Sequence, residues 1–403
     1  MALRARAEAL LRRNWREGTR RDGATYAFTC PAPPRYRHMW HWDSCFHAIV
    51  WRLIDPARAR AELRTVLRSG RLDGFLPHTV FWDAPAGWRR TPLYATRAVR
   101  GDHCTETIGP PLLAMAWELV ADASPDEPDF RTEALGALAM HLRWLERERD
   151  PDGDGLLTIV VPDESGLDDS PKYGPVFGRL AHDRAGYALL MERGRRARWD
   201  SHTLIARHDH HVEDVWVNVA YALSLHAMAR LSADASWTAR AARVERALLE
   251  RCLDERTGLF FDLAGRAERP VRVSTWSSLS PLVLPALPEH VRRRLVEEHL
   301  LDERRYRAPV GIPSVSMQEP SFKPCWDRFR TWRGPSWMNT AWLLAPAMRE
   351  LGYADAADHV VGSLAGAVLR HGFREYYHPL TGEGLAARGF GWSTLLADLV
   401  VGS

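Results

Sequence analysis

Apolar residues recur along the chain in two kinds of helical segment that alternate. One kind is apolar on most sides, and the other carries one apolar stripe, as Trp237, Ala241, Val244 and Leu248 illustrate at helical spacing. Each segment of the first kind pairs with one of the second, and the pairs are 43–53 with 56–69, 105–122 with 130–148, 212–231 with 237–252, 276–286 with 288–301, 336–351 with 354–371, and 390–401 with 2–14.

This alternation predicts a layered helical fold. A helix that is apolar all round must be buried, and an amphipathic helix can cover it. Six buried helices, each with a covering helix, indicate two concentric rings, so we predict an all-α protein built as an (α/α)6 barrel. Strand signals are confined to 155–161 and 258–263, and no low-complexity linker divides the chain. Residues 1–403 are therefore expected to form one domain, a length that suits a large enzyme fold.

The links between successive helix pairs are long, whereas the links within a pair are short. The long links are 70–104, 149–211, 302–335 and 372–389. In an antiparallel ring, alternate links fall on opposite ends, so the long links should share one rim. Loops on a rigid scaffold are where function concentrates, and we expect the functional site on that rim.

Composition narrows the class of protein. A net charge of +3 is too small to indicate a nucleic-acid partner, and no apolar run approaches the 18 residues of a membrane span. Five cysteines without CxxC spacing indicate reduced thiols and therefore a cytoplasmic protein. The N-terminus, "MALRARAEALLRR", has the arginines of a transit peptide, but its apolar residues fit one helix face and it lacks the apolar core of a signal peptide.

Tryptophan is unusually abundant, with 17 residues. Several lie in loops rich in Gly, Pro and charge, where Trp often forms a platform for a sugar ring, although most of them are expected in the core. The chain has no Gly-rich phosphate loop and no GxSxG motif. These features predict a small-molecule ligand and no cofactor, and they do not indicate an oligomeric state.

Two acidic motifs lie in or beside the long links. "YRHMWHWDSCF" (36–46) places Asp43 at the start of a helix, where it is either an N-cap or a ligand contact. "ESGLDDSPKY" (164–173) holds Glu164, Asp168 and Asp169 in a turn restricted by Gly and Pro. Such a turn is typical of a solvated acidic loop. Because other motifs are expected on the same rim, a catalytic role is the stronger interpretation.

Two further motifs follow in the last third of the chain. "CWDRFRTWRGPSWMN" (325–339) sets Arg333 between tryptophans, where it would bind a carboxylate, either of a ligand or of a loop acid. "FREYYHPLTGEGLAARGFGWS" (373–393) adds Glu375 and Glu383 in a turn-rich segment. Acids on the rim that also carries Asp168 provide what a general acid/base pair requires.

Two stretches contain metal-ligand residue types, and we predict no metal at either. "DPDGDG" (150–155) matches the start of a calcium loop through Asp150, Asp152 and Asp154, but the twelfth position is Val161 instead of Glu. A tight turn is the better interpretation, and calcium binding there stays open. "HDHHVED" (208–214) has no HExxH spacing and no Cys partner.

Four segments of the chain, in order, resemble glycoside hydrolase family 63: "WHWDSCF", "ESGLDDSP", "WRGPSW" and "FREYYHPLTGEG…FGWS". In length the chain is similar to the short bacterial members of that family, the mannosylglycerate and glucosylglycerate hydrolases. The resemblance spans residues 36 to 393 and implies an (α/α)6 barrel that hydrolyses an α-glycosidic bond with inversion and without metal. It also implies that Asp168 is the general acid and Glu375 the general base. One departure is Gly109 before Pro110 and Pro111, where such enzymes often carry Gln.

The resemblance and the motifs together predict which residues contact the substrate. We expect aromatic walls around the sugar and polar side chains on its hydroxyls, and the predicted binding residues are Tyr36, Trp40, Trp42, Asp43, Asp214, Gln318, Trp332, Arg333, Gly334, Tyr376, Glu383 and Trp392. A glycerate group would also need a cation, for which the candidates are Lys172, Arg207, His210, His211 and Arg333.

The expected activity is inverting hydrolysis of a small α-linked solute such as mannosylglycerate or glucosylglycerate. The related trehalase family 37 shares the E-S-G-x-D segment and a terminal G-F-G-W, so a trehalase or α-glucosidase acting on a disaccharide is an alternative. A non-catalytic sugar-binding barrel would keep the tryptophans but need neither acid. A helical-barrel isomerase or epimerase would rely on His pairs, for which residues 208–211 give the one hint.

Overall fold

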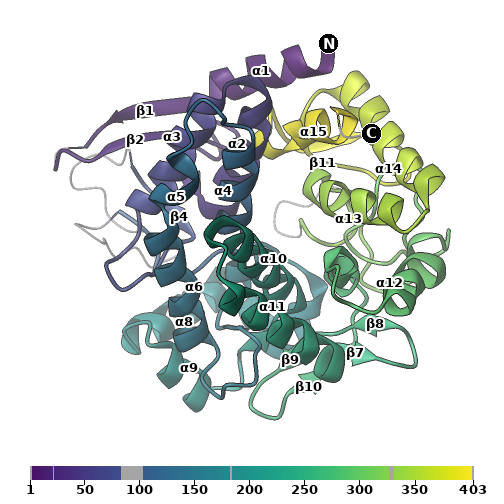
Figure 1. Cartoon of the computed structure of the whole chain (residues 1–403). Helices are drawn as coiled ribbons and strands as arrows, with labels where there is room; N and C mark the ends of the chain where they lie inside the picture. The colour runs from purple at the N-terminus through teal and green to yellow at the C-terminus, as the bar shows by residue number, and fades with distance from the viewer. Residues whose placement is uncertain (1, 21, 83–102, 182–183, 326–330, 402–403) are drawn as a thin grey trace.

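The computed structural model describes residues 2–20, 22–82, 103–181, 184–325 and 331–401. Figure 1 shows the helices arranged around a closed circuit, with the first and last helices side by side. The α-helices are α1 Ala2–Asn14, α2 His41–Ile54, α3 Pro56–Arg68, α4 Leu113–Asp122, α5 Phe130–Glu133, α6 Leu135–Arg149, α7 Gly174–Phe177, α8 Arg184–Arg196, α9 Ser201–Arg207, α10 Val215–Ser232, α11 Ala235–Ala247, α12 Glu289–Leu295, α13 Met338–Glu350, α14 Ala354–His371 and α15 Leu396–Val401.

Shorter helical turns extend or connect these helices. The 3₁₀ turns are η1 Pro162–Ser165, η2 Pro171–Tyr173, η3 Gly178–Ala181, η5 Trp276–Val283 and η7 Gly391–Leu395, and the π-helical turns are η4 Leu248–Cys252 and η6 Val296–Leu300. The two π turns continue α11 and α12, so the predicted segments 237–252 and 288–301 are helical nearly to their ends.

Six helical elements form a continuous inner series. Contacts run from α2 to α4, then to α10, η5, α13 and η7, and η7 in turn contacts α2. Tryptophans of this series, among them Trp51, Trp117, Trp216 and Trp276, are fully buried. Most of α10 is buried as well, which agrees with its apolar sequence.

A second set of helices lies outside the first. Contacts join α3 to α2, α11 to α10, α12 to η5 and α14 to α13, while α1 contacts both α2 and η7. These helices bury one face; in α3 the buried stripe includes Ala59, Leu63 and Val66. The predicted alternation of buried and covering helices is therefore observed for these pairs. Helix α6, which was expected to cover α4, contacts mainly α10 instead.

Two predicted inner helices differ from the expectation. Residues 105–112 are not helical, because Pro110 and Pro111 lack the amide hydrogens that a helix needs, and α4 begins at Leu113. The segment 276–286 is the 3₁₀ turn η5, which contains Pro281. Its tighter winding still lets Trp276 and Leu279 point into the core.

The expectation of an all-α chain underestimates the strands. The two predicted strand segments shrink to short pieces of small sheets, and further strands accompany them. The strands are β1 Trp15–Thr19, β2 Thr25–Thr29, β3 Met39–Trp40, β4 Thr79–Val80, β5 Thr158–Ile159, β6 Val212–Glu213, β7 Leu253–Asp254, β8 Leu259–Phe260, β9 Leu263–Ala264, β10 Arg269–Pro270, β11 Arg374–Tyr377 and β12 Gly384–Arg388.

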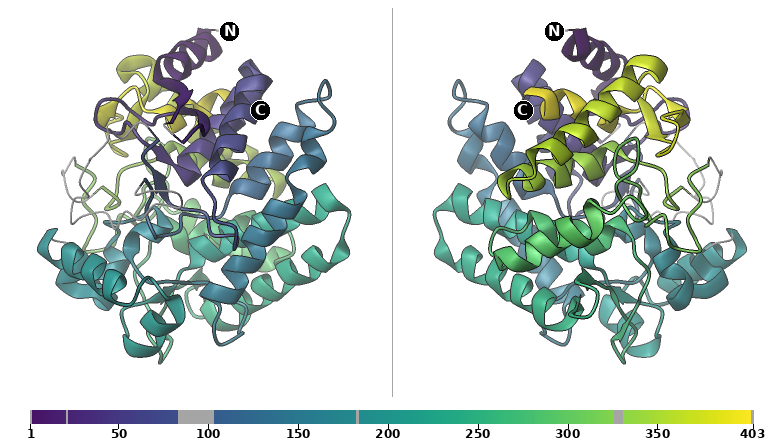
Figure 2. Two further views of the ribbon diagram at one scale, coloured as in Figure 1. Left: turned by 90° about the vertical axis from the view of Figure 1, so that its left-hand side faces the viewer. Right: turned by 90° about the vertical axis from the view of Figure 1, so that its right-hand side faces the viewer.

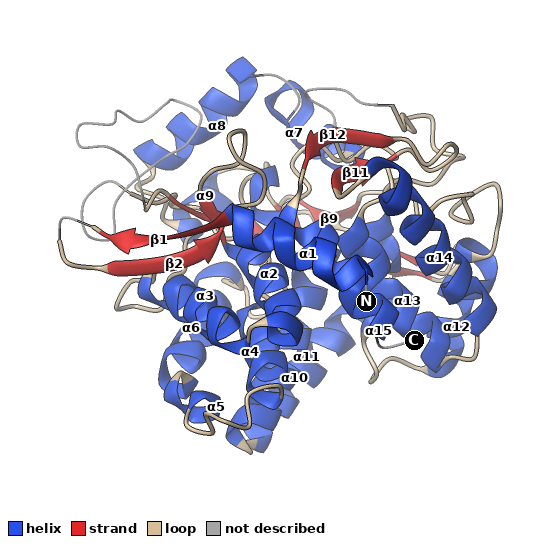
Figure 3. Ribbon diagram, turned by 90° about the horizontal axis from the view of Figure 1, so that it is seen from above, coloured by secondary structure: helices blue, strands red, loops and turns tan. Residues whose placement is uncertain are grey.

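Elements of two long links, 149–211 and 372–389, lie toward one end of the helical body. Figure 3 shows β11, β12, α7 and α8 on one side and α5 on the other, and Figure 2 shows α8 and α5 on opposite sides as well. One four-stranded sheet, in the order β10-β9-β6-β5, joins three segments that are far apart in sequence. No helix in the described part of the chain is long and apolar enough to cross a membrane.

Candidate active site

A cavity of about 190 Å³ opens where the predicted motifs meet. All four motifs contribute side chains to its wall, from links that are up to several hundred residues apart. The predicted site residues that line it are Tyr36, Trp40, Trp42, Asp43, Asp168, Trp332, Glu375 and Trp392. Residues 326–330 of the third motif lie outside the described part of the chain.

The first motif is held at the cavity by a strand pair and a helix start. Trp40 in β3 pairs with Thr79 in β4, and both residues line the cavity. Helix α2 begins at His41, so Trp42 and Asp43 lie in its first turn. Asp43 is 4% exposed, and burial raises its pKa to about 7.

The acidic loop is anchored by one of its own carboxylates. Glu164 is fully buried; its Oε2 accepts from Arg149 Nη1 at 2.9 Å and from the Val160 amide at 2.8 Å, and its Oε1 accepts from the Ile108 amide at 3.1 Å. Since these bonds satisfy its charge, Glu164 fixes the loop rather than facing the cavity.

Gly166 lets the loop lie directly on an aromatic ring. Its φ of +71° is in the left-handed region, and a Cβ at this position would overlap the Trp42 ring. The loop can therefore approach the cavity floor closely enough for Asp168 to line the wall.

We expect Gly166→Ala to lower the free energy of unfolding by about 1–3 kcal/mol and to reduce kcat/KM, because both the backbone strain and the overlap would move the loop. Gly352→Ala is a matched control, since Gly352 also has a positive φ of +92° but faces open space. Thermal unfolding and steady-state kinetics of the two variants would check this. Equal losses in both variants would contradict a special role for the contact with Trp42.

Three carboxylates of this loop line the cavity together: Asp163, Asp168 and Asp169. Asp163 accepts a hydrogen bond from the Tyr187 hydroxyl, and Asp169 accepts one from the Thr331 backbone. Asp168 receives no hydrogen bond from another side chain of the described residues and is open to the cavity. Its carboxyl is therefore the one of the three that is free to meet a ligand.

The electrostatic setting keeps these acids protonated to a higher pH than usual. Asp168 is exposed to the cavity, but the protein atoms around the cavity partly desolvate it; this desolvation, with the charge of Glu375, raises its pKa to about 6. Burial and the charge of Asp168 also raise the pKa values of Asp163 and Asp169. The like charge that acts on Asp168 is therefore Glu375, which lines the same cavity, whereas Glu164 of its own motif is paired with Arg149.

Glu375 is held by a β-hairpin. It lies in β11, where the pairing with β12 shifts register between Arg374 and Tyr376, and such an irregularity can re-aim a side chain. Oε1 accepts from the Tyr36 hydroxyl at 2.9 Å and Oε2 from the Ala387 amide at 3.1 Å. Burial raises the pKa of Glu375, while these hydrogen bonds and the charge of Arg35 oppose the rise.

Aromatic rings form the remaining wall. Trp332 stacks on Trp337 at 3.8 Å with an angle of 7° between the planes, and Trp42 meets Trp392 edge-on at 4.9 Å. The indole nitrogens of Trp337 and Trp392 are buried and have no hydrogen-bond partner among the described residues. An aromatic wall of this kind suits the apolar face of a ring-shaped ligand.

Six predicted binding residues do not line the cavity. Asp214 is fully buried, caps α10 and bonds to Lys172 at 2.7 Å, and Tyr376 is fully buried against Trp337. Gln318 and Glu383 are exposed. The other two are Arg333, whose charge acts on Asp169, and Gly334, whose amide donates to Ser314.

The predicted cations for a carboxylate also lie elsewhere. Lys172 is buried between Asp214 and Asp262, Arg207 is exposed, and His210 is hydrogen-bonded to Arg193. His211 is buried and bonds to the carbonyl of residue 208, and Arg333 is again outside the wall. The one Arg or Lys among the described residues that line the cavity is Arg35.

Sequence reasoning missed Arg35, Asp163, His78 and Trp337, which all line the cavity. Three of them had a usable signal, because Arg35 precedes Tyr36 in the first motif, Asp163 precedes the acidic loop, and Trp337 belongs to the third motif. His78 had none. The His78 ring also lies beside Gly109, the position where similar enzymes often carry Gln. A Cβ at Gly109 would lie 3.2 Å from His78 Nδ1, so the ring occupies space that a larger side chain would need.

Comparison with known proteins finds two similar glycosylglycerate hydrolases. The chain is 31% identical to the mannosylglycerate hydrolase of Thermus thermophilus over 92% of this chain and 96% of that protein. It is 27% identical to the glucosylglycerate hydrolase of Mycolicibacterium hassiacum over 97% of this chain and 96% of that protein.

A solved structure of similar fold is a GH63 mannosylglycerate hydrolase from Thermus thermophilus in complex with Tris and D-glycerate. It matches with a TM-score of 0.85 and 29% identity, covering 99% of this chain and 100% of that chain. Residues 36–393 match the family model described as the mannosylglycerate hydrolase MGH1-like glycoside hydrolase domain. The chain therefore belongs to the MGH1-like glycoside hydrolases and is an enzyme of that class.

Proposed function

We propose that residues 1–403 form a single (α/α)6 barrel that hydrolyses mannosylglycerate or glucosylglycerate with inversion at the anomeric carbon. The observation that carries the proposal is the pair Asp168 and Glu375. They come from different motifs, line one cavity and each carry a raised pKa. The relatives named for these two substrates support the choice of substrate.

Asp168 is the general acid of the proposed reaction. Its proton passes to the glycosidic oxygen as the bond to the anomeric carbon breaks, and the aglycone leaves as glycerate. An acid must be protonated to do this, and the pKa of about 6 keeps a useful fraction of Asp168 protonated just below neutral pH. The absence of a side-chain partner among the described residues leaves the proton available to the substrate.

Glu375 is the general base. Its carboxylate takes a proton from a water molecule, and the oxygen of that water attacks the anomeric carbon from the face opposite the leaving group. An α-linked substrate then gives the β anomer of the free sugar. The hydrogen bonds from Tyr36 and Ala387 fix the carboxylate and favour its charged form.

The remaining wall would hold the sugar. The rings of Trp42 and Trp332 offer apolar surface, and Asp43 offers a carboxyl group. A sugar hydroxyl can both donate and accept, so it can bond to this carboxyl in either protonation state. Residues Gln318 and Glu383 have no part in this proposal, because they are exposed outside the cavity.

Arg35 would bind the glycerate carboxylate. It lines the cavity beside Tyr36, with its guanidinium carbon 5.2 Å from the centre of the Tyr36 ring. We expect Arg35→Gln to raise KM for glycosylglycerate about tenfold or more, with a smaller change in kcat, since a charge-assisted hydrogen bond to the substrate would be lost. The methyl esters of the same substrates lack the carboxylate charge, and the variant should leave their kinetics nearly unchanged at a pH above the acid limb, where Glu375 is ionised with or without Arg35. An equal loss on both kinds of substrate would assign the carboxylate to another residue.

The function is tested by incubating the enzyme with α-mannosylglycerate, α-glucosylglycerate and trehalose, and following the products by proton NMR. Release of glycerate with the β-sugar as the first anomer supports the proposal. Cleavage of trehalose alone would identify the enzyme as a trehalase instead. The α anomer appearing first would exclude inversion. An altered sugar without a released aglycone would indicate an isomerase, and binding without turnover a sugar-binding protein.

A further inference from the structure

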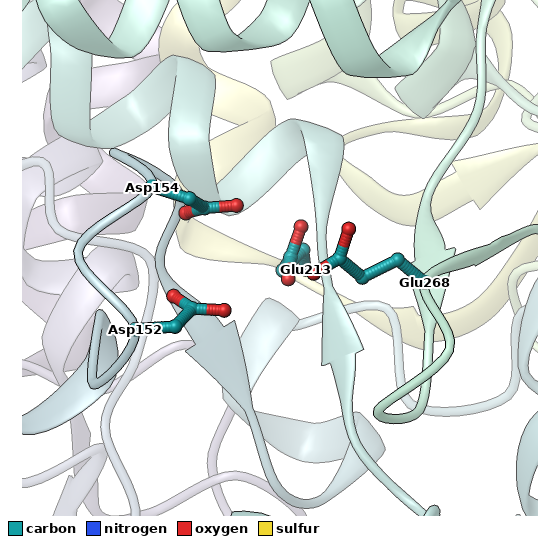
Figure 4. Close-up of side chains that lie close together, drawn as sticks. All are labelled: Asp152, Asp154, Glu213 and Glu268. Atoms are coloured by element: carbon teal, nitrogen blue, oxygen red, sulfur yellow. The ribbon is translucent and has the colours of Figure 1, made fainter.

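Four carboxylates gather on the four-stranded sheet, outside the active site. Asp152 and Asp154 lie in the turn between α6 and β5, Glu213 lies in β6, and Glu268 lies in the turn between β9 and β10. One oxygen from each side chain lies within 4.8 Å of the others. Figure 4 shows the four side chains converging on a common space.

Glu213 is the unusual member of the group. It is 6% exposed, and its Oε2 has no hydrogen-bond partner among the described residues. Burying a carboxylate without a partner is costly. Burial, together with the charges of Asp154 and Glu268, raises the pKa of Glu213 to about 9. Its carboxylate points into the cluster (Figure 4).

One positive side chain lies in the cluster but does not balance it. Arg251 Nη2 lies 2.9 Å from Asp154 Oδ2 and also contacts Glu268. It makes no hydrogen bond to Glu213, so one charge faces four carboxylates. Asp152, Glu213 and Glu268 also line a cavity of about 340 Å³, which leaves room and a route of entry for an ion.

We propose that Asp152, Asp154, Glu213 and Glu268 bind a divalent cation, and that the cation is Ca²⁺. Carboxylate oxygens are the ligands that Ca²⁺ prefers, and ligands on opposite sides of this ion are roughly 4.6–5.2 Å apart. All four oxygens lie within 4.8 Å of one another, which is compatible with that span. Ca²⁺ also accepts several carboxylates in irregular geometry, whereas Mg²⁺ demands near-ideal octahedral geometry and usually keeps several waters. Together, the positive charges of Ca²⁺ and Arg251 nearly cancel the negative charges of the four carboxylates.

This site revises the interpretation of the DPDGDG turn as metal-free. That interpretation rested on Val161, which stands where a calcium loop needs its last acidic ligand. The sheet supplies Glu213 and Glu268 in its place, from residues far along the chain. Asp150, the first residue of the turn, is not a ligand, because its carboxylate bonds to Arg243 at 2.6 Å and to the Gly155 amide.

A cation here would hold the framework behind the catalytic loop. Strand β5 pairs with Glu213 through Thr158, and the chain then runs directly into η1 and the loop that carries Asp168. Asp214, next to Glu213, caps α10 and accepts a hydrogen bond from the Tyr173 hydroxyl, whose oxygen also lies 2.6 Å from the Ser165 hydroxyl. The proposed role is to position this framework, and no step of the hydrolysis passes through the ion.

The test is calcium binding to protein that has been stripped with EDTA and dialysed, measured by calorimetric titration with CaCl₂ and by thermal unfolding. Saturating CaCl₂ should raise Tm by about 3 °C or more, and MgCl₂ should bind more weakly. Glu213→Gln and Asp152→Asn should each weaken Ca²⁺ binding at least about tenfold, because each removes a charged ligand. Glu255→Gln, at an exposed carboxylate outside the cluster, should bind Ca²⁺ like the parent.

A competing state is a protonated Glu213 with Arg251 as the only cation. In that state Ca²⁺ would bind no more tightly than Mg²⁺. In saturating CaCl₂, Glu213→Gln would then have a Tm equal to or above that of the parent. Either result would overturn the proposal. Should Glu213→Gln fail to fold, Glu268→Gln carries the same test, because the Glu268 side chain is 39% exposed and its change does not disturb the core. Unaltered Ca²⁺ binding in Glu268→Gln would also count against the site.

Discussion

Asp168→Asn should lower kcat for glycosylglycerate hydrolysis by about 10³-fold or more. Asn has nearly the same shape as Asp but cannot donate a proton to the leaving oxygen. The aglycone is an alkoxide of high basicity, so its departure depends strongly on that proton. KM should change little, because Asp168 contributes to the transition state rather than to uniform binding.

A second substrate separates proton donation from a general structural effect. An activated α-glycoside with a dinitrophenyl leaving group departs without protonation, so Asp168→Asn should hydrolyse it at a rate near that of the parent enzyme. Equal losses on both substrates would show that the substitution disturbs the site instead. Asp169→Asn and Asp163→Asn are the neighbouring comparisons. Both should reduce kcat less than Asp168→Asn, because Thr331 and Tyr187 already hold these two carboxyls.

The pH profile follows from the same two groups. The acid limb of kcat/KM reports Glu375, which must lose its proton, and the alkaline limb reports Asp168, which must keep it. Since burial raises the pKa of Asp168 only to about 6, activity should fall as pH rises through neutrality, and the optimum should lie on the acid side of it. In Asp168→Asn the alkaline limb should disappear.

Strong helical periodicity explains which parts of the fold could be predicted. Helices α3, α11 and α14 could be predicted from the sequence, because one face of each helix is apolar and the other is charged. The hairpin β1–β2 was not, because "WREGT" has no alternation of apolar and polar residues and is only half-buried. Segment 105–112 looked like a helix by composition, and its prolines outweighed that signal.

The candidate site was predictable where its residues share a local motif. Asp168, Glu375 and Trp392 could be found because each lies in a stretch rich in acids, Gly and aromatics on one expected rim. Asp214 also lies among acids on the expected rim, but its carboxylate is bonded to Lys172 and Tyr173 instead of facing the cavity. No local sequence pattern predicts such long-range contacts. His78 illustrates the reverse case, in which a residue outside every motif lines the cavity because of tertiary packing.

Glu375→Ala should lower kcat by about 10³-fold or more for every substrate, including the activated one, because no other described carboxylate is held by Tyr36 and Ala387 in position to activate water. This behaviour differs from that of Asp168→Asn, whose loss should depend on the leaving group. The contrast between the two variants therefore identifies acid and base independently of the substrate's name.

External azide sharpens the assignment of Glu375. Removing its side chain opens space on the face opposite the leaving group, and azide needs no general base to attack the anomeric carbon. Azide should therefore restore turnover of the activated α-glycoside by Glu375→Ala and yield the β-glycosyl azide, which NMR distinguishes from the α form. Asp168→Asn, which keeps its base, should give no azide product of that configuration beyond the parent's level. An α-glycosyl azide from Glu375→Ala would mean that Glu375 lies on the leaving-group side, and the roles of the two carboxylates would have to be exchanged.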